Sequence, residues 1–509
     1  MATIVKSIGA RGIEGFQVDV EVQILSGVTM MNIVGLGDTA VKEAKDRIES
    51  SLNRIDLDFP KKRIVVNLSP SDIKKSGTYF DLPMLIGILL ESEQVKLRNF
   101  CLGEYAIFGE LGLNGELKSF SGVLPLVIAA KTRGFKKVIL PREALNEARL
   151  VSGIELFGFI NIKDLIAFME RRLFYQPPKF IAPPAIGINS NLDFADVCGH
   201  KELLNYIVAA TAGNHNLLMI GAPGCGKSMI AKRIPTILPS MTEEEMLEVT
   251  SLYSISGLLK RNNLINTRPF RAPHYNASLN ALIGGGTNAT PGEISLAHNG
   301  VLFLDEFAEF SRSALEALRQ PLEDRKVTIS RVRQSNSYPA NFLLVAAMNP
   351  CKCGNFGNKK CTCSSYDVTR YRQRISGPIL DRIDIQKFLG KEEFINNTNV
   401  SKNTSSKELR NRVEIARSVQ NKRFAGIEGI SSNGQMESIH MREFCVLDGE
   451  CQKLLEQSYK RYDFSARTYH KIIKISRTFA DMDQSEHIRR PHMLYSLMSR
   501  DMDKESINI

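Results

Sequence analysis

The feature that most constrains this chain is the segment Gly221–Ser228 (GAPGCGKS), which follows the apolar run Leu217–Ile220 and precedes the helical pattern Met229–Ile234. A strand, a glycine-rich turn and a helix in this order form a phosphate-binding loop. The backbone N–H groups of the turn surround a β-phosphate, and the positive end of the helix faces it. Lys227 can reach the β- and γ-phosphate oxygens, and Ser228 can ligate Mg²⁺. The pattern predicts an α/β fold around a nucleotide site with these cofactor-binding residues: Gly221, Ala222, Pro223, Gly224, Cys225, Gly226, Lys227 and Ser228.

Two further apolar runs end in polar residues that could complete the site. Val301–Leu304 is followed by Asp305, which can hold Mg²⁺, and by Glu306, which can orient or deprotonate the attacking water. Taken alone, this run could be a core strand that ends in two solvated acids, but its place after the phosphate loop favours the catalytic interpretation. A strand over 342–348 ends at Asn349, whose amide could bind the same water and the γ-phosphate. The alternative for Asn349 is an Asn-Pro turn.

Four of the nine cysteines form the pattern CxC-x7-CxC directly after Asn349. Four thiolates can close a tetrahedral Zn²⁺ site, and Gly354 and Gly357 would let the loop double back. One-residue spacing is less usual than CxxC, so four reduced, unligated thiols remain the alternative. A catalytic zinc is disfavoured because four sulfurs leave no open position. The sequence therefore predicts a structural zinc on Cys351, Cys353, Cys361 and Cys363.

The composition is that of a globular protein with a basic surplus. Hydrophobic residues make up 43% and charged residues 24%, and 66 Lys and Arg against 55 Asp and Glu give a formal charge of +11. A basic chain can gather DNA or RNA, although many proteins that bind neither are equally basic. No apolar run reaches the roughly 18–20 residues that span a bilayer, and the N-terminus lacks a signal-peptide pattern. We expect a cytoplasmic protein.

A chain of 509 residues is too long for one hydrophobic core. Strands and helices alternate at first, a proline-rich segment follows, and a second alternating stretch carries the phosphate-binding motifs. Beyond the polar stretch 396–406, which we expect to be a surface loop, the pattern becomes helical. The expected divisions are 1–175, a linker over 176–190, an ATPase core over 191–390, and a helical lid over 391–509.

These motifs in this order, and above all the segment RPFRAPHYNASLNALIGGGTNATPGEISLAHNGVLFLDEFAEFSRSALEALRQPLE, resemble AAA+ ATPases of the magnesium-chelatase-like branch. Together with the N-terminal region, the resemblance is to the ComM/YifB family and covers nearly the whole chain. It implies an AAA+ P-loop core with a helical lid, preceded by a Lon-protease-like (ribosomal S5-like) α/β domain. It also implies ATP and Mg²⁺ as cofactors and DNA as partner. The expected protein is a homo-hexameric helicase that drives branch migration during recombination in natural transformation.

The resemblance suggests roles for four arginines. Arg382 in ILDRID is similar to the arginine finger that reaches a neighbouring subunit's ATP, and Arg467 in FSARTYHK looks like the sensor-2 arginine of the lid. A planar, permanently charged guanidinium suits both tasks, although either residue could instead form a surface salt bridge. Insertions typical of this branch are expected around 282–295 and as a β-hairpin of 327–333 with 338–343. On that hairpin, Arg331 and Arg333 would contact DNA phosphates, unless they only form a solvated face.

The segments IVVNLSPSDIKKSGTYFDLPMLIGILL and FGELGLNGELKSFSGVLPLVIAAKTRGFKKVILP resemble the Lon protease domain. That protease needs a serine activated by a lysine. The corresponding positions hold Tyr79 and Leu124, although Ser76 and Ser121 are nearby. We therefore expect a scaffold or partner-binding domain rather than a protease.

Three alternative functions can be weighed. A magnesium-chelatase motor subunit that remodels a protein or metal-insertion complex shares the ATPase core, but the Lon-like domain and the cysteine cluster disfavour it. Tyr79 and Leu124 disfavour an ATP-dependent protease, and the combination of Lys227, Asp305 and Glu306 disfavours a non-enzymatic scaffold. The histidines do not cluster, and a structural role is expected for His274.

Overall fold

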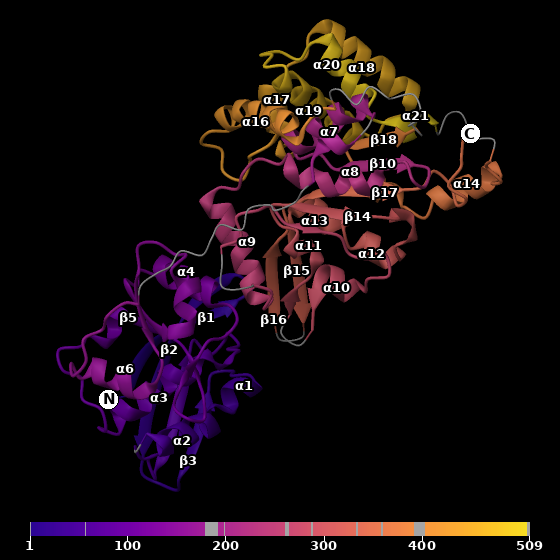
Figure 1. Cartoon of the computed structure of the whole chain (residues 1–509). Coiled ribbons are helices and arrows are strands. Elements are labelled where there is room, and N and C mark those ends of the chain that lie inside the picture. The colour runs from indigo at the N-terminus through magenta and orange to yellow at the C-terminus, as the bar shows by residue number, and fades with distance from the viewer. Residues whose placement is uncertain are drawn as a thin grey trace.

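The computed structural model describes residues 2–55, 57–178, 192–197, 199–259, 264–286, 289–331, 334–357, 360–390 and 403–505. Figure 1 shows an N-terminal region, a central region around a parallel sheet, and a helical C-terminal region that lies against the central one. Residues 179–190 of the expected linker lie outside the described residues. The predicted α/β architecture with a helical C-terminal region is confirmed.

The N-terminal region is built on a four-stranded sheet with the order β1-β2-β4-β3. The sheet is antiparallel except for the pair β3–β4. Alternating residues of β2, namely Val18, Val20 and Val22, are fully buried, as expected for a strand with one face against a core. The strands are β1 (Thr3–Arg11), β2 (Glu14–Leu25), β3 (Met30–Val34) and β4 (Arg63–Ser69).

Two apolar helices cover this sheet, α3 (Asp81–Glu91) and α4 (Val123–Thr132). A parallel three-stranded sheet with the order β5-β8-β9 completes the region. The hydrophobic core of the region runs from Val5 to Met169, so these residues form a core of their own. The remaining elements are α1 (Thr39–Lys42), α2 (Ala44–Arg54), β5 (Tyr105–Ile107), β6 (Glu110–Leu111), β7 (Leu117–Lys118), β8 (Lys137–Pro141), α5 (Leu145–Ala148), β9 (Glu155–Phe159) and α6 (Ile162–Met169).

The central region contains a parallel sheet with the order β11-β14-β17-β10-β18. All residues of β10, β14 and β17 are buried, as expected for strands covered on both faces. The strands are β10 (Leu217–Gly221), β11 (Phe270–Arg271), β14 (Val301–Leu304), β17 (Leu343–Met348) and β18 (Ile385–Leu389). The helices are α7 (Lys201–Gly213), α8 (Lys227–Arg233), α9 (Glu243–Ile255), α10 (Leu279–Ile283), α11 (Glu293–Leu296), α12 (Arg312–Glu316), α13 (Arg319–Asp324), α14 (Ser365–Arg372) and α15 (Gly377–Leu380).

Two hairpins project from this region: β12 (Gly284–Gly285) with β13 (Thr290–Pro291), and β15 (Lys326–Arg331) with β16 (Gln334–Pro339). The second strand of the longer hairpin was expected over 338–343, and this is wrong, because β16 begins at the polar residues that we assigned to the turn. Asn336 and Tyr338 of β16 are buried, and the Tyr338 hydroxyl donates a 2.8 Å hydrogen bond to the Ala289 carbonyl. Buried, hydrogen-bonded polar side chains therefore lie within this strand.

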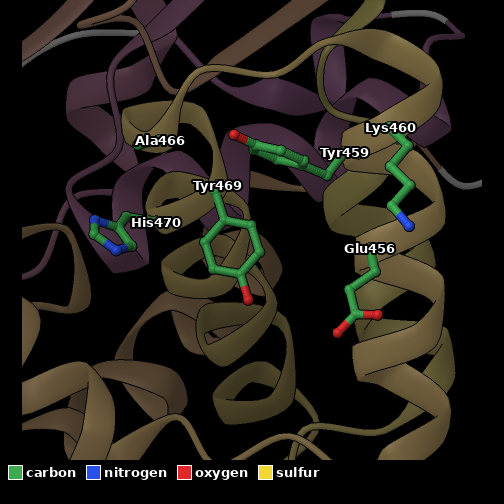
Figure 2. Close-up of a pocket in the computed structure, with 6 residues that line it drawn as sticks. All are labelled: Glu456, Tyr459, Lys460, Ala466, Tyr469 and His470. Carbon is green, nitrogen blue, oxygen red and sulfur yellow. The ribbon is translucent and has the colours of Figure 1, made fainter.

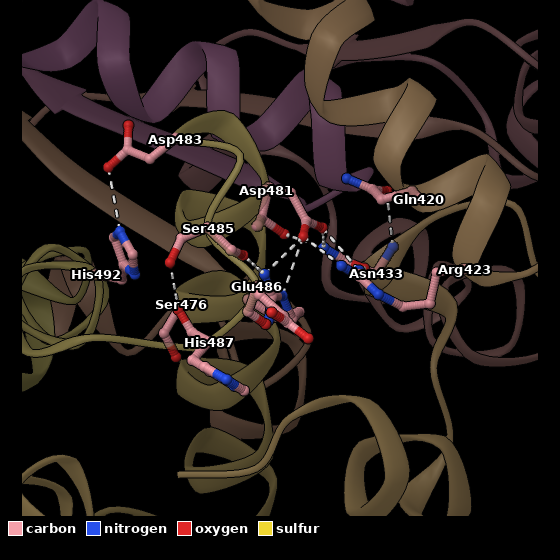
Figure 3. Close-up of polar contacts among 12 residues, drawn as sticks. Gln420, Arg423, Asn433, Ser476, Asp481, Asp483, Ser485, Glu486, His487 and His492 are labelled. Atoms are coloured by element: carbon pink, nitrogen blue, oxygen red, sulfur yellow. Dashed lines mark hydrogen bonds and ion pairs between the residues drawn. The ribbon is translucent and has the colours of Figure 1, made fainter. Parts of the chain in front are cut away.

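The C-terminal region consists of helices, two of which share a core with α7 of the central region: α16 (Ser406–Arg423) and α19 (Ala466–Met482). A buried ionic network, drawn in Figure 3, joins these two helices. Asp481 is fully buried and accepts hydrogen bonds from Arg423 Nη1 (2.8 Å), Arg477 Nε (3.0 Å) and Asn433 Nδ2 (2.7 Å). The other helices are α17 (Ser438–Phe444), α18 (Gly449–Tyr462), α20 (Arg490–Leu497) and α21 (Asp501–Glu505).

The end of the expected polar loop differs from the prediction. Residues 396–402 lie outside the described residues, but Ser405 caps α16 by accepting a hydrogen bond from Glu408 N, and Ser406 is its first residue. The Ser-Ser pair that resembles loop sequence is therefore a helix start, where serine is favoured because its side chain binds free N–H groups.

The N-terminal and central regions meet along α4 and α9. The buried Glu147 side chain of α5 lies at this junction, where its Oε1 accepts hydrogen bonds from Leu124 N (2.8 Å) and from Ser254 Oγ of α9 (2.5 Å). Nearby, Arg11 Nε donates a 2.8 Å hydrogen bond to the Ser335 carbonyl of β16. Among the described residues, no helix has the length and apolar character that a membrane crossing requires.

Candidate active site

The three polar segments predicted from the sequence meet at one edge of the central sheet. β14, β17 and β10 are neighbours, and Asp305, Asn349 and the phosphate loop follow their carboxyl ends. Ligands of open α/β sheets bind at this edge. A cavity of about 610 Å³ lies there, and Lys227, Ser228, Asp305, Glu306 and Asn349 line it together.

The phosphate loop has the backbone that its glycines allow. Gly224 (φ 79°) and Gly226 (φ 91°) are left-handed, and α8 begins at Lys227 directly after them. The buried Lys227 ammonium donates hydrogen bonds to Gly221 O (2.6 Å) and, at 3.4 Å, to Asn349 Oδ1. The loop amides, the helix N-terminus and this ammonium therefore fit a polyphosphate.

Two oxygen ligands suited to Mg²⁺ lie beside the loop. Ser228 Oγ is 2.6 Å from Asp305 Oδ2, and the second oxygen of Asp305 accepts a 2.9 Å hydrogen bond from Glu306 N. Mg²⁺ prefers oxygen ligands and commonly takes one or two carboxylates plus phosphate oxygens. Glu306 is exposed and has left-handed backbone (φ 52°), which directs the chain away from the sheet at the cavity. Its side chain is exposed at the cavity.

Among the residues that line this cavity but were not assigned to it by the sequence analysis are Lys232, His274 and Tyr275. The ring of His274, for which a structural role is expected, lies at this cavity with its centre 4.3 Å from that of the Tyr275 ring. Lys232 lies one helical turn after Ser228 and could have been found from helix periodicity. His274 and Tyr275 follow β11, which is too short to be recognised as a strand from sequence.

Arg382 and Arg467 meet at a carboxylate away from this cavity. Arg382 Nη2 lies 2.6 Å and Arg467 Nη2 lies 3.2 Å from the same oxygen, Oε1 of Glu323. The hydrogen bond from Arg382 lowers the pKa of Glu323. Both arginines belong to the described residues, and neither is among those that line the cavity around Lys227. The structure therefore places the two arginines together at Glu323, and neither belongs to the lining of the nucleotide cavity.

The hairpin arginines can be located only in part. Arg331 is the last residue of β15, opposite Gln334, at the tip of the hairpin. Its side chain and the whole of Arg333 lie outside the described residues.

The four predicted zinc ligands are gathered on the loop that follows Asn349. Their sulfur atoms all lie within 4.8 Å of one another, and Cys351 Sγ is 3.4 Å from Cys353 Sγ and 3.9 Å from Cys361 Sγ. Tetrahedral Zn²⁺ with Zn–S bonds of about 2.3 Å needs sulfur separations of about 3.8 Å. The donor set and its spacing fit one zinc ion with four thiolate ligands.

At the positions that we expect from the sequence to correspond to a Lon serine and lysine, the side chains are packed into the core. Tyr79 is 7% exposed, and its hydroxyl accepts a 3.3 Å hydrogen bond from Ala10 N. Burial raises the pKa of this hydroxyl. Leu124 is fully buried. Ser76, Ser121 and Tyr79 line a cavity of about 580 Å³ between the N-terminal region and the hairpin β15–β16.

A further pocket of about 500 Å³ lies on the C-terminal helices. Figure 2 shows its lining from α18 and α19, with the ring of Tyr459 near that of Tyr469. It shares no lining residue with the nucleotide cavity, within the chain as described.

Three family models match successive parts of the chain: "Subunit ChlI of Mg-chelatase" over residues 20–144, "Magnesium chelatase, subunit ChlI" over 193–396, and "Magnesium chelatase, subunit ChlI C-terminal" over 403–500. The chain is 37% identical over 510 residues to YifB of Escherichia coli, which covers 100% of this chain and 98% of that protein. It is 38% identical over 505 residues to competence protein ComM of Haemophilus influenzae, covering 98% and 97%. Its N-terminal region is similar to Lon protease 2 of Bacillus subtilis, 32% identical over 120 residues, or 24% of this chain and 20% of that protein.

Proposed function

Because this chain belongs to the ComM/YifB family of magnesium-chelatase-like AAA+ ATPases, we propose that it acts in the cytoplasm as a homo-hexameric motor that couples ATP hydrolysis to movement along DNA. Membership of the family implies ATPase activity, with ATP and Mg²⁺ as cofactors. The observation that carries the proposal is the convergence of Lys227, Asp305 and Asn349 on one cavity.

We assign the hydrolytic roles from the positions of these side chains. The loop amides and Lys227 would hold the phosphates, while Ser228 and Asp305 would ligate Mg²⁺, which neutralises phosphate charge when bound. Glu306 would orient the attacking water and accept its proton, since its carboxylate is exposed at the cavity. Asn349 lies 3.4 Å from the Lys227 ammonium, which supports a role next to the γ-phosphate.

The ring is proposed because the two candidate phosphate-contacting arginines lie away from their own phosphate loop. Arg382 and Arg467 share Glu323, and a neighbouring subunit is the simplest source of a phosphate for them. Such an arginine stabilises the negative charge that spreads during phosphoryl transfer. We propose that both arginines complete the active site of the next subunit.

DNA is proposed as the partner on the basis of charge, of the hairpin and of the relative named as a competence protein. The chain carries a net charge of +11, and β15 ends in Arg331 at the tip of a projecting hairpin. In a ring, such hairpins would face the strand that passes through, and Arg331 and Arg333 would contact its phosphates. We propose branch migration of recombination intermediates as the activity.

We propose that the N-terminal region is a non-proteolytic scaffold, because Tyr79 and Leu124 offer neither a nucleophilic hydroxyl activated by a lysine nor the lysine itself. We also propose that Cys351, Cys353, Cys361 and Cys363 bind one structural zinc ion. Purified protein should then contain about one zinc per chain, which Cys→Ser substitutions remove.

The test of the main proposal is the ATPase rate without DNA and with single strands, duplex or a four-way junction. We expect the junction or the single strands to raise the rate most, and the stimulation to fall steeply with salt. A rate that is the same under all four conditions would contradict the DNA motor. It would favour a chelatase-type motor that remodels a protein or metal-insertion complex, as the names of the matching family models suggest.

A further inference from the structure

The cysteine loop, residues 351–363, is connected to the nucleotide site in two independent ways. The first is through the chain itself, because Pro350 alone separates Asn349 from the ligand residue Cys351. Cys351 is fully buried, and its carbonyl accepts a 3.0 Å hydrogen bond from Gly354 N, which closes a tight turn. The position of Asn349 is therefore tied to the position of the first sulfur ligand.

The second connection is a packing contact with the phosphate loop. The backbone of Gly354 lies so close to the Pro223 ring that a Cβ atom on Gly354 would be 2.6 Å from Cδ and 2.9 Å from Cγ. Real Cβ atoms do not approach other atoms so closely, since such a distance lies far inside van der Waals contact. Pro223 belongs to the phosphate loop and lines the nucleotide cavity. The turn between the first and second pairs of sulfurs thus rests directly on the rim of that cavity.

The cysteine loop also contacts Arg372 of α14. Its Nε donates a 3.3 Å hydrogen bond to the Pro350 carbonyl, and its guanidinium lies 5.0 Å from the centre of the Phe356 ring. Cation–π contacts of this kind contribute to ordering a loop. The cysteine loop is therefore placed between α14 and the phosphate loop.

We infer that the metal-bound cysteine loop positions the site for ATP hydrolysis, and we call it a brace. It holds Asn349 next to the γ-phosphate and packs against Pro223 of the phosphate loop. The inference rests on the proposed ATPase function and the proposed zinc. Four sulfur ligands from one short segment, bound to the same metal ion, can order a loop that has few apolar side chains to bury. Without the metal, the turn at Gly354 relaxes, and Asn349 and Pro223 lose a fixed position.

The two glycines of the loop provide a matched test. Gly354 (φ 78°) and Gly357 (φ 82°) are both left-handed, so alanine causes similar backbone strain at either. A Cβ on Gly357 meets no atom within 4 Å, whereas one on Gly354 meets Pro223. Gly354→Ala therefore disturbs the brace, and Gly357→Ala controls for strain.

The experiment measures zinc content, thermal unfolding, binding of a fluorescent ATP analogue and kcat on both variants and on wild type. We expect equal zinc content and similar unfolding temperatures. We also expect weaker nucleotide binding and a kcat about tenfold lower for Gly354→Ala alone, as for other residues that support a site from behind. Equal nucleotide binding and kcat in the two variants, with zinc present, would overturn the brace.

Removing the metal from wild type tests this inference separately from the proposed zinc site and the proposed ATPase function on which it rests. Zinc is extracted from wild type with a mercurial and a chelator, and the mercurial is then removed by thiol. The zinc-free protein should have lost its ATPase activity, and adding zinc back should recover most of it. Activity unchanged in zinc-free protein overturns the brace while the ATPase proposal stands. Wild-type protein that contains no zinc as purified without chelator overturns the metal site, and zinc-loaded wild type that hydrolyses no ATP overturns the proposed function itself.

Discussion

The nucleotide cavity lies at the edge of the parallel sheet of the central region, whereas the N-terminal region with the cavity beside Tyr79 is built on a mostly antiparallel sheet, and the two cavities hold different kinds of side chain. In the first, adjacent parallel strands place Asp305 and Asn349 beside Lys227. In the second, Tyr79 and Leu124, which we expect from the sequence to stand in place of a Lon serine and lysine, are packed into the core. If the N-terminal region is a non-proteolytic scaffold, as we propose, the comparison teaches that a fold can keep its packing without the chemistry found in its relatives. We therefore expect substitutions near the first cavity to change rates, and substitutions near the second to change stability.

The largest expected effects come from single substitutions of the proposed catalytic groups. Glu306→Gln should lower kcat by roughly 10²–10⁴-fold, the usual contribution of a general base. Arg382→Ala should lower it by roughly 10³–10⁵-fold, the contribution of an arginine finger. Both variants should still bind ATP, as measured with a fluorescent analogue. An Arg382→Ala variant with wild-type turnover would remove this residue from the site.

Mixing these two variants tests whether Arg382 acts in the neighbouring subunit. An interface between an Arg382→Ala subunit that binds ATP and a Glu306→Gln subunit that contributes Arg382 contains every catalytic group. The mixture should regain part of the activity, well below wild type, because other interfaces lack both groups. No recovery in rings that demonstrably exchange subunits would rule out action in trans.

An intermediate effect is expected at the hairpin between the two cavities. Replacing Arg331 and Arg333 by alanine should weaken DNA stimulation but leave basal hydrolysis largely intact. If each arginine contacts one phosphate, the slope of log affinity against log salt should become less steep by about 2. Lys326→Ala, at the exposed base of the same hairpin, controls for loss of charge. Unchanged stimulation in the double variant would exclude the hairpin tip from DNA binding.

A smaller effect is expected where the two regions join. Glu147→Leu leaves Leu124 N and Ser254 Oγ without their shared acceptor, so the free energy of unfolding should fall by roughly 1–3 kcal/mol. Glu147→Gln keeps an acceptor oxygen and should fold normally. Thermal and denaturant unfolding of both variants, with ATPase rates alongside, would measure the difference.

The same carboxylate predicts a dependence on pH. Burial raises the pKa of Glu147 above its unfolded value, so its protonated form is favoured in the folded protein. Its stabilising contribution is complete below the unfolded pKa of about 4.3 and is lost as pH rises through the folded pKa. Relative to wild type, Glu147→Gln should therefore gain stability on going from acid to neutral pH. If the free energy of unfolding of Glu147→Gln, relative to that of wild type, stays constant or falls over that interval, the assignment is contradicted.

The smallest effect is expected from Tyr79→Phe, which removes only the hydroxyl that accepts from Ala10 N. The free energy of unfolding should fall by about 0.5–1.5 kcal/mol, and the ATPase rate should not change. Neither wild type nor variant should cleave an unfolded protein substrate in the presence of ATP. ATP-dependent cleavage by wild type would contradict the proposal that the N-terminal region, with the cavity beside Tyr79, is non-proteolytic.

The sequence predicted the parts of the site that follow long apolar strands, because a buried run and the polar residue at its end are both local signals. Lys227, Asp305 and Asn349 were placed in this way. His274 was not, because β11 before it has only two residues, Phe270 and Arg271. The polar start of β16 resembled a turn because the acceptor for its buried Asn336 side chain, the Ala289 carbonyl, lies in a distant segment.

Contacts between distant parts of the chain could likewise not be predicted from the sequence. Nothing in the sequence near Glu323 indicates that Arg382 and Arg467 meet there, since each comes from a different helix or loop. The role of Glu147 between Leu124 and Ser254 also depends on how two regions dock. Such pairings follow from tertiary packing, which local patterns do not encode.

The position of Glu323 has a consequence for how the proposed ring assembles. The pair of Arg467 with Glu323 is solvent-exposed (58% and 46%), and such pairs contribute only about 0–1 kcal/mol, whereas the Arg382 side chain is 10% exposed. Glu323 thus keeps both guanidinium groups together in a free subunit. In the proposed ring, a triphosphate, which carries more charge, would take its place when two subunits approach. Bound nucleotide would then stabilise the contact between subunits, and ring assembly should increase with ATP concentration even when hydrolysis is blocked.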